Sequence, residues 1–135
     1  MNDKLQKILE AKRIKEEIVI LNKHLTPTLN DIKTIDVIYE LFLIFVKEKN
    51  YKTQCVYHRS KFLFIIIMLY SPATLIGGSM IIGLRDKLAD ICNVSSRSII
   101  SDNVSRMIFL FEKYSDFRDD VDSFYEIIQK KINLN

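Results

Sequence analysis

Apolar residues recur along most of this chain at intervals of three and four residues, a spacing that places them on one face of an α-helix. The pattern predicts helices over about residues 3–25, 30–49, 57–70, 84–92, 95–111 and 117–132. The interval 71–83 lacks this periodicity and contains Gly77, Gly78 and Gly83, where we expect positive φ angles. We therefore predict an all-α fold, a compact bundle of about five to six helices.

The first predicted helix differs from the others because it carries a narrow apolar stripe on a charged surface. The members of this stripe are Ile8, Ala11, Ile18, Leu21 and Leu25. Thr26-Pro27 ends the helix, since proline disfavours helical conformation at the residue before it. We predict that residues 1–28 form a helical arm, a candidate dimerisation element, and that residues 29–135 form the main helical domain.

The segment after Lys61 is so apolar that the helix 57–70 is predicted to be central in the core. Residues 62–84 carry no formal charge and are long enough to span a bilayer, which requires about 20 apolar residues. Ser71-Pro72 interrupts this stretch, and only nine residues before it, 62–70, are continuously apolar. The pattern therefore favours a buried core helix over a membrane span.

The composition narrows the class of protein. The chain has 135 residues, which is enough for one ordinary domain, and it contains only three glycines and two prolines, too few for the regular turns of a β sandwich or barrel. Cys55 and Cys92 are too few and too far apart for a disulfide framework. The first 23 residues are charged throughout and lack the apolar segment of a signal peptide. We expect a cytoplasmic protein.

The net charge is only +3, but the charges are segregated along the chain. Between Lys47 and Lys61 five basic residues accompany one acid, whereas between Asp116 and Glu126 five acids accompany Arg118. The basic stretch would attract a polyanion such as nucleic acid. Solvated surface is the commoner origin of such charge runs, so the segregation alone does not choose between these interpretations.

The residues that carry enzyme chemistry are sparse. His24 and His58 lie at no metal-ligand spacing to a cysteine or to each other, and Gly77-Gly78 is not followed by the lysine of a phosphate-binding loop. The acidic run 116–122 lacks the glycine and the final glutamate of a calcium loop. We expect no enzymatic activity, no cofactor and no metal.

Residues 84–107 have the layout of a helix-turn-helix within the predicted bundle. Ala89 is small where the first helix must approach the second, and Asn93, four residues later, can adopt the left-handed conformation of a tight turn. Val94 is expected to pack back into the core, and Ser95 or Ser96 to cap the second helix. Two short helices joined by a turn also occur in folds that do not bind DNA.

One face of the second predicted helix carries small hydroxyl side chains and two arginines. Its polar residues are Ser95, Ser96, Arg97, Ser98, Ser101, Asp102, Ser105 and Arg106. Such side chains permit close approach to a major groove and can bond to phosphates or base edges, whereas a solvated helix more often carries Lys–Glu pairs. Asp102 opposes this interpretation, because it would lie near phosphate oxygens.

The stretch LADICNVSSRSIISDNVSRM, residues 88–107, resembles the C-terminal DNA-binding domain of the bacterial replication initiator DnaA. That family shows an Ile-Gly or Leu-Ala-type start, a short turn and a helix beginning Arg-Asp-His-Thr-Thr, and this stretch aligns with it without a gap. Upstream, HRSKFLFIIIML, residues 58–69, resembles the family's basic loop and the apolar helix after it, which contacts phosphates. The family's paired glycines at the turn are Asn93-Val94 here, and its His-Thr-Thr is Arg97-Ser98-Ile99.

The resemblance covers about residues 32–112, implies an all-helical fold there and places residues 95–98 at sequence-reading positions. We predict that the segment from Ser95 to Arg106 enters the major groove, with Arg97 and Ser98 nearest the bases. Basic residues before it would bind the flanking phosphates. The full predicted DNA-binding set is Lys52, His58, Arg59, Lys61, Arg85, Ser95, Ser96, Arg97, Ser98, Ser101 and Arg106.

The sequence therefore predicts a DNA-binding protein whose partner is double-stranded DNA. A regulator or replication accessory of a phage or mobile element would fit so short a chain. The first helix is the candidate contact of a homodimer. The alternative is a helical protein–protein interaction module without nucleic-acid binding, using the apolar stripe of the first helix and the acidic last helix.

Overall fold

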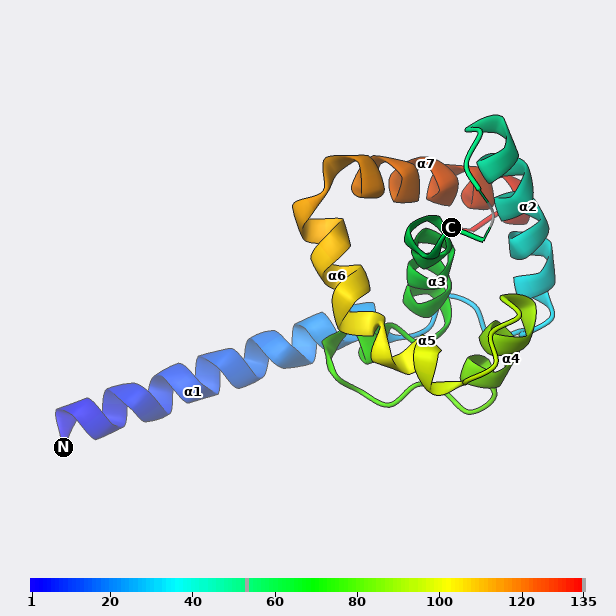
Figure 1. Ribbon diagram of the computed structural model, residues 1–135. Coiled ribbons are helices and arrows are strands. Elements are labelled where there is room, and N and C mark those ends of the chain that lie inside the picture. Colours follow the sequence, from blue (N-terminus) through cyan, green and yellow to red (C-terminus); the bar gives the residue numbers. More distant parts are fainter. Residues whose placement is uncertain (53, 135) are drawn as a thin grey trace.

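The computed structural model describes residues 1–52 and 54–134 and confirms the all-α prediction (Figure 1). Residue 53, in the predicted basic stretch, and residue 135, at the end of the predicted main domain, lie outside the described residues. All regular structure in the described ranges is helical. The helices are α1 (Asn2–Leu21), α2 (Thr34–Glu48), α3 (Val56–Tyr70), α4 (Leu84–Ile91), α5 (Ser98–Asp102), α6 (Val104–Lys113) and α7 (Ser115–Ile132), with 3-10 turns η1 (Asn22–Leu25) and η2 (Pro72–Ile76).

Helix α3 is the centre of the bundle, as its composition predicts. It packs against α2, α6 and α7, which surround it (Figure 1). From Ser60 to Tyr70 every residue except Met68 is buried, so the helix has no exposed face over this length. A helix that is apolar on all sides is stable only when neighbours cover all of it.

The faces of α2 and α7 that meet α3 form an aromatic layer. The ring of Phe42 lies 5.3 Å from that of Phe62 and 5.5 Å from that of Phe124, measured between centroids. Phe45 contacts Phe124 at the same distance, 5.5 Å. These separations are typical of favourable aromatic pairs, which add to the free energy gained from burial.

Helix α1 extends away from the bundle, as Figure 1 shows. All residues from 1 to 24 are exposed, and the main contacts of α1 within the described chain are with η1, which directly follows it. The predicted helix 3–25 is therefore an α-helix that ends at Leu21 in a 3-10 turn. Thr28 and Leu29 attach the next segment to the bundle, because both amides donate to the carbonyl of Leu69, at 2.8 and 3.0 Å.

The irregular segment 71–83 contains the short turn η2, and two of its three glycines have positive φ angles. Gly77 has φ +94° and Gly83 has φ +89°, as expected. The prediction is wrong for Gly78, whose φ angle is not positive. Gly78 instead permits close approach, since a Cβ there would lie 2.8 Å from the carbonyl oxygen of Ala73. Among the described helices, none is both long and apolar enough to cross a membrane.

The single helix predicted from Ser95 or Ser96 to Phe111 is wrong, because the structure divides it into α5 and α6 at Asn103. The side-chain amide of Asn103 donates to the carbonyl of Ile99 at 2.6 Å. In a continuous helix the backbone amide of residue 103 would use that carbonyl, so the side chain competes with the helical bond. The predicted cap at Ser95 or Ser96 is also wrong, because α5 begins at Ser98, after Arg97, without a side-chain cap bond. The hydroxyl groups of Ser96 and Ser98 bond to each other instead, at 2.7 Å.

Candidate nucleic-acid interface

The turn between α4 and α5 has the geometry expected of a tight helix-turn-helix connection. Asn93 is left-handed, with φ +54°, as predicted. The amide of Val94 donates to the carbonyl of Ala89 at 3.0 Å, and the amide of Asn93 donates to that of Asp90 at 3.2 Å. These two bonds form a Schellman motif, which ends a helix and reverses the chain. Val94 packs against the core, so the turn is fixed from both sides.

The turn brings five of the predicted DNA-binding residues to one surface. A shallow hollow of about 550 Å³ is lined by Arg85 from α4 and by the consecutive residues 95–98, together with Ala89, Asp90 and Val94. Arg85, Arg97 and Ser98 are exposed, and Ser96 is half-buried. Guanidinium groups and hydroxyls on one accessible surface are donors suited to phosphate oxygens and base edges.

Arg97 forms an ion pair with Asp86, in which Nε lies 2.9 Å from Oδ1. Both side chains are more than half exposed. Exposed pairs of this kind contribute about 0–1 kcal/mol, so exchanging the carboxylate for a phosphate costs little. The pair also holds the guanidinium of Arg97 over α4, next to the hollow.

The later members of the predicted reading segment lie beside this hollow rather than in it. Ser101 and Arg85 line a second hollow of about 620 Å³, between the glycine-containing segment, α4 and α6. Arg106 lies on α6, after the break at Asn103, and is exposed. A continuous recognition helix from 95 to 106 is therefore absent from the described chain, and the polar surface is built by a turn and two short helices.

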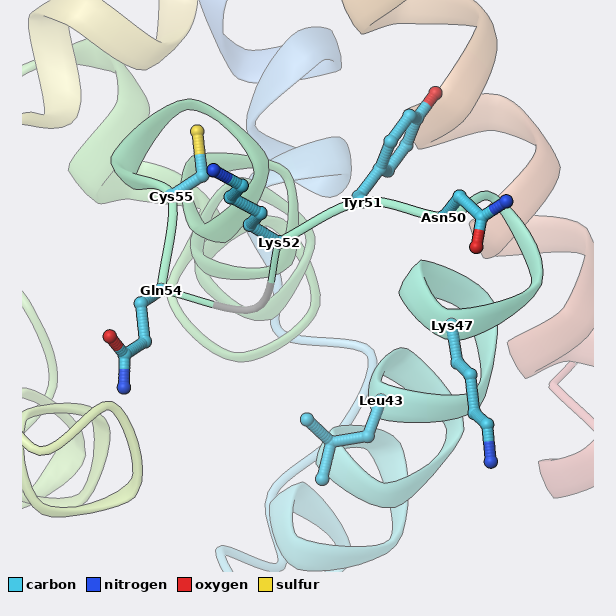
Figure 2. Close-up of a pocket in the computed structure, with 7 residues that line it drawn as sticks. All are labelled: Leu43, Lys47, Asn50, Tyr51, Lys52, Gln54 and Cys55. Carbon is cyan, nitrogen blue, oxygen red and sulfur yellow. The ribbon is translucent and has the colours of Figure 1, made fainter.

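Two predicted phosphate-binding residues lie near the turn from another side. Arg59, half-buried on α3, lines a hollow of about 410 Å³ together with Cys92 and Asn93 of the turn. Lys52 is exposed and lines a hollow of about 760 Å³ (Figure 2). Leu43 and Gln54 line both this hollow and the one beside Arg59. Arg59 therefore lies beside the turn and Lys52 lines the adjoining hollow, but neither hollow shares a lining residue with the one at Arg97.

The prediction that Lys61 binds phosphate is wrong, because the structure places its side chain inside the protein. Its side chain is 2% exposed, and Nζ donates to Oδ2 of Asp120 at 2.6 Å and lies 2.9 Å from Nδ1 of His58. The ammonium also lies 4.6 Å from the ring centre of Tyr51 and 4.8 Å from that of Tyr57. A buried, paired ammonium cannot reach a phosphate, so Lys61 belongs to the protein interior and not to a DNA-binding surface.

His58 belongs to the same internal cluster, although it too is a predicted DNA-binding residue. Its ring stacks on Tyr51, with centroids 3.8 Å apart. Burial, followed by the charge of Lys61, lowers the pKa of His58 below its usual 6.5. At neutral pH the ring is therefore uncharged and cannot contribute electrostatically to phosphate binding.

Asp120 is the acceptor at the centre of this cluster, and its side chain is 8% exposed. It accepts from Tyr51 Oη at 2.7 Å as well as from Lys61, and Lys49 lies 3.8 Å from its other oxygen. Burial opposes its ionisation, but the bonds from Lys61 and Tyr51 outweigh burial and hold the pKa of Asp120 below 3.8. The bond to Asp120 raises the pKa of Tyr51 to about 12. The cluster connects α3, α7 and the loop after α2.

This pairing was not predicted from the sequence, although the spacing of apolar residues on α7 indicates that Asp120 is buried. Asp120 lies three residues after Phe117 and four before Phe124, which places it on the buried stripe of α7. A buried carboxylate requires a buried cation or several donors, and Lys61 directly precedes the most apolar run of the chain, residues 62–70. Part of the predicted acidic surface of α7 is therefore internal.

No family model matches this chain, and the comparisons with curated proteins and with solved structures found no match. The resemblance to the DnaA C-terminal domain therefore depends on residues 58–69 and 88–107. Within residues 1–52 and 54–134, no group of three or more His, Cys, Asp and Glu side chains could hold a metal ion.

Proposed function

We propose that the chain binds double-stranded DNA through the surface formed by α4, the turn at Asn93 and α5. The observation that carries this proposal is the convergence of Arg85 and Arg97 with the Ser95, Ser96 and Ser98 hydroxyls around one open hollow. These donors lie on a turn held by backbone bonds and by Val94, which packs against the core. A preorganised set of donors reduces the entropy lost when a ligand binds.

The proposed roles follow from exposure and position. Arg97 and Ser98 contact base edges, whereas Arg85, Arg59 and Lys52 contact the flanking phosphates. Lys61 and His58 leave the predicted set, because both belong to the internal cluster with Asp120. In biological terms we retain a regulator or replication accessory as the proposed role.

The test is fluorescence anisotropy with a labelled duplex of about 30 bp at about 50 and 200 mM salt. Three phosphate contacts give a log–log slope of about −2.7, so this change in salt should weaken binding about 40-fold. Absence of binding at the lower salt, with circular dichroism showing a folded helical protein, would refute the proposal. Protein–protein interaction would then be the function to pursue.

Variants separate the proposed surface from general charge. Arg85→Gln should weaken binding to all sequences and make the salt slope less steep by about 0.9. Lys113→Gln removes an equal charge from the exposed end of α6, away from the hollow, and is the matched control. Arg97→Gln should weaken binding to a selected site more than to random DNA. Equal effects of Arg85→Gln and Lys113→Gln would contradict the assignment of the surface.

A further inference from the structure

Helix α1 carries many large apolar side chains that are exposed to solvent. Eight leucine, isoleucine and valine side chains between residues 5 and 21 are each more than 40% exposed, and none of the residues of α1 is buried. Three of these side chains, Ile14, Ile18 and Leu21, lie on one face of α1, and the other five lie elsewhere around the helix. Exposed apolar side chains that share one helix face indicate an interaction site. Most helical stability in proteins comes from the packing of an apolar face, and α1 has no buried residue that could supply it.

The apolar side chains of the body-proximal half of α1 follow the spacing of a coiled coil. Ala11, Ile14, Ile18 and Leu21 are separated by three, four and three residues. This is the a–d–a–d pattern of a heptad repeat, with Ala11 and Ile18 at a and Ile14 and Leu21 at d. Lys4 and Lys7 occupy the preceding a and d positions, which confines the apolar seam to the half of α1 nearer the bundle.

Charges beside the seam specify the partner. In this register Glu10 occupies a g position and Lys15 the e position of the next heptad. In a parallel pair, g of one helix faces the following e of the other, so Glu10 meets Lys15 of a second copy twice. In an antiparallel pair g faces g, which would bring Glu10 and Glu17 of the two copies together. Complementary charge therefore favours a parallel pair of identical helices.

We infer that α1 pairs in parallel with α1 of a second copy of the chain, through the seam Ala11, Ile14, Ile18 and Leu21. Both bundles then lie at the same end of the paired helices, because each continues from the C-terminal end of α1 (Figure 1). The seam covers about two heptads, so the dimer should dissociate on dilution. This inference does not depend on DNA binding, and its test contains no DNA.

Sedimentation velocity of the full chain from about 5 to about 200 µM tests the pairing. The wild type should shift from monomer to dimer with concentration, and Ile18→Glu should remain monomeric. Ile20→Glu is the matched control, because Ile20 is 63% exposed against 51% for Ile18 but lies outside the seam. Because α1 lies outside the bundle, circular dichroism should show the bundle folded in both variants.

A charge exchange tests the orientation. Glu10→Lys and Lys15→Glu should each make dimerisation several-fold weaker, and the double variant should restore it. Residues five apart on one helix do not face each other, so restoration cannot come from a bond within α1. A monomeric wild type at the highest concentration, or equal effects of Ile18→Glu and Ile20→Glu, would overturn the inference. Failure of the double variant to recover would overturn the parallel arrangement.

Discussion

Replacing Asp120 with asparagine should lower the free energy of unfolding by about 3–5 kcal/mol, because it leaves the buried ammonium of Lys61 without its counter-charge. Lys61 is 2% exposed and Asp120 8% exposed, so water cannot hydrate either group after the change. The contacts of the ammonium with His58 at 2.9 Å and with the rings of Tyr51 at 4.6 Å and Tyr57 at 4.8 Å would remain. Even a desolvated cation–π contact contributes only about 2 kcal/mol, so these contacts do not compensate.

Urea denaturation at pH 7 measures this effect. The matched control is Asp122→Asn, which removes an exposed carboxylate from the same helix and should change stability by less than about 0.5 kcal/mol. The double variant Lys61→Met with Asp120→Leu should be much closer to wild type than either single variant, since it removes both buried charges. Equal effects of Asp120→Asn and Asp122→Asn would refute the buried ion pair.

Three further predictions concern the same structure. The depressed pKa of His58 means that its neutral form favours the fold, so its contribution to stability is present above about pH 6.5 and is lost as the pH falls. In urea denaturation, His58→Gln should therefore reduce the loss of unfolding free energy between neutral and acidic pH. His24→Gln, at an exposed position, should not. Asn93→Ala should cost about 1–2 kcal/mol, because its φ is +54°, while Asn93→Gly should cost less; similar melting temperatures would contradict the left-handed turn. Burial raises the pKa of Cys92 to about 11, so this thiol should alkylate slowly at pH 8 in the folded protein and rapidly in urea, as peptide mass spectrometry can follow.

The helical framework could be predicted because it depends on periodicity. The buried positions of α2, such as Ile38 and Phe42, follow from apolar spacing alone, and the central place of α3 follows from its continuous apolar composition. The left-handed turn at Asn93 could also be predicted, since few residues other than glycine and asparagine tolerate that conformation.

The break between α5 and α6 could not be predicted from periodicity. The apolar spacing from Ile99 to Met107 continues through Asn103 without interruption. What ends α5 is a choice between two donors for one carbonyl, the backbone amide and the side-chain amide of Asn103. Both donors belong to the same residue, so the pattern of apolar positions contains no information on which one forms the bond.

The misassignment of Lys61 has a similar origin. A lysine in the second turn of a helix, shortly after His58 and Arg59, has the same local sequence whether it binds phosphate or lies inside the protein. Its partner Asp120 is 59 residues away, on α7. Such long-range pairs depend on how helices pack, whereas local periodicity describes only one helix at a time.

The central claim is that DNA binds at α4, the turn and α5, and NMR titration of the isotopically labelled chain with duplex DNA at low salt tests it most directly. We predict amide shift changes concentrated between Arg85 and Ser98, with smaller changes near Lys52 and Arg59. Amides of α7 around Asp120 should remain unchanged, because that part of the helix faces the internal cluster. Changes confined to α1 or α7, or no changes with folded protein and excess duplex, would contradict the account.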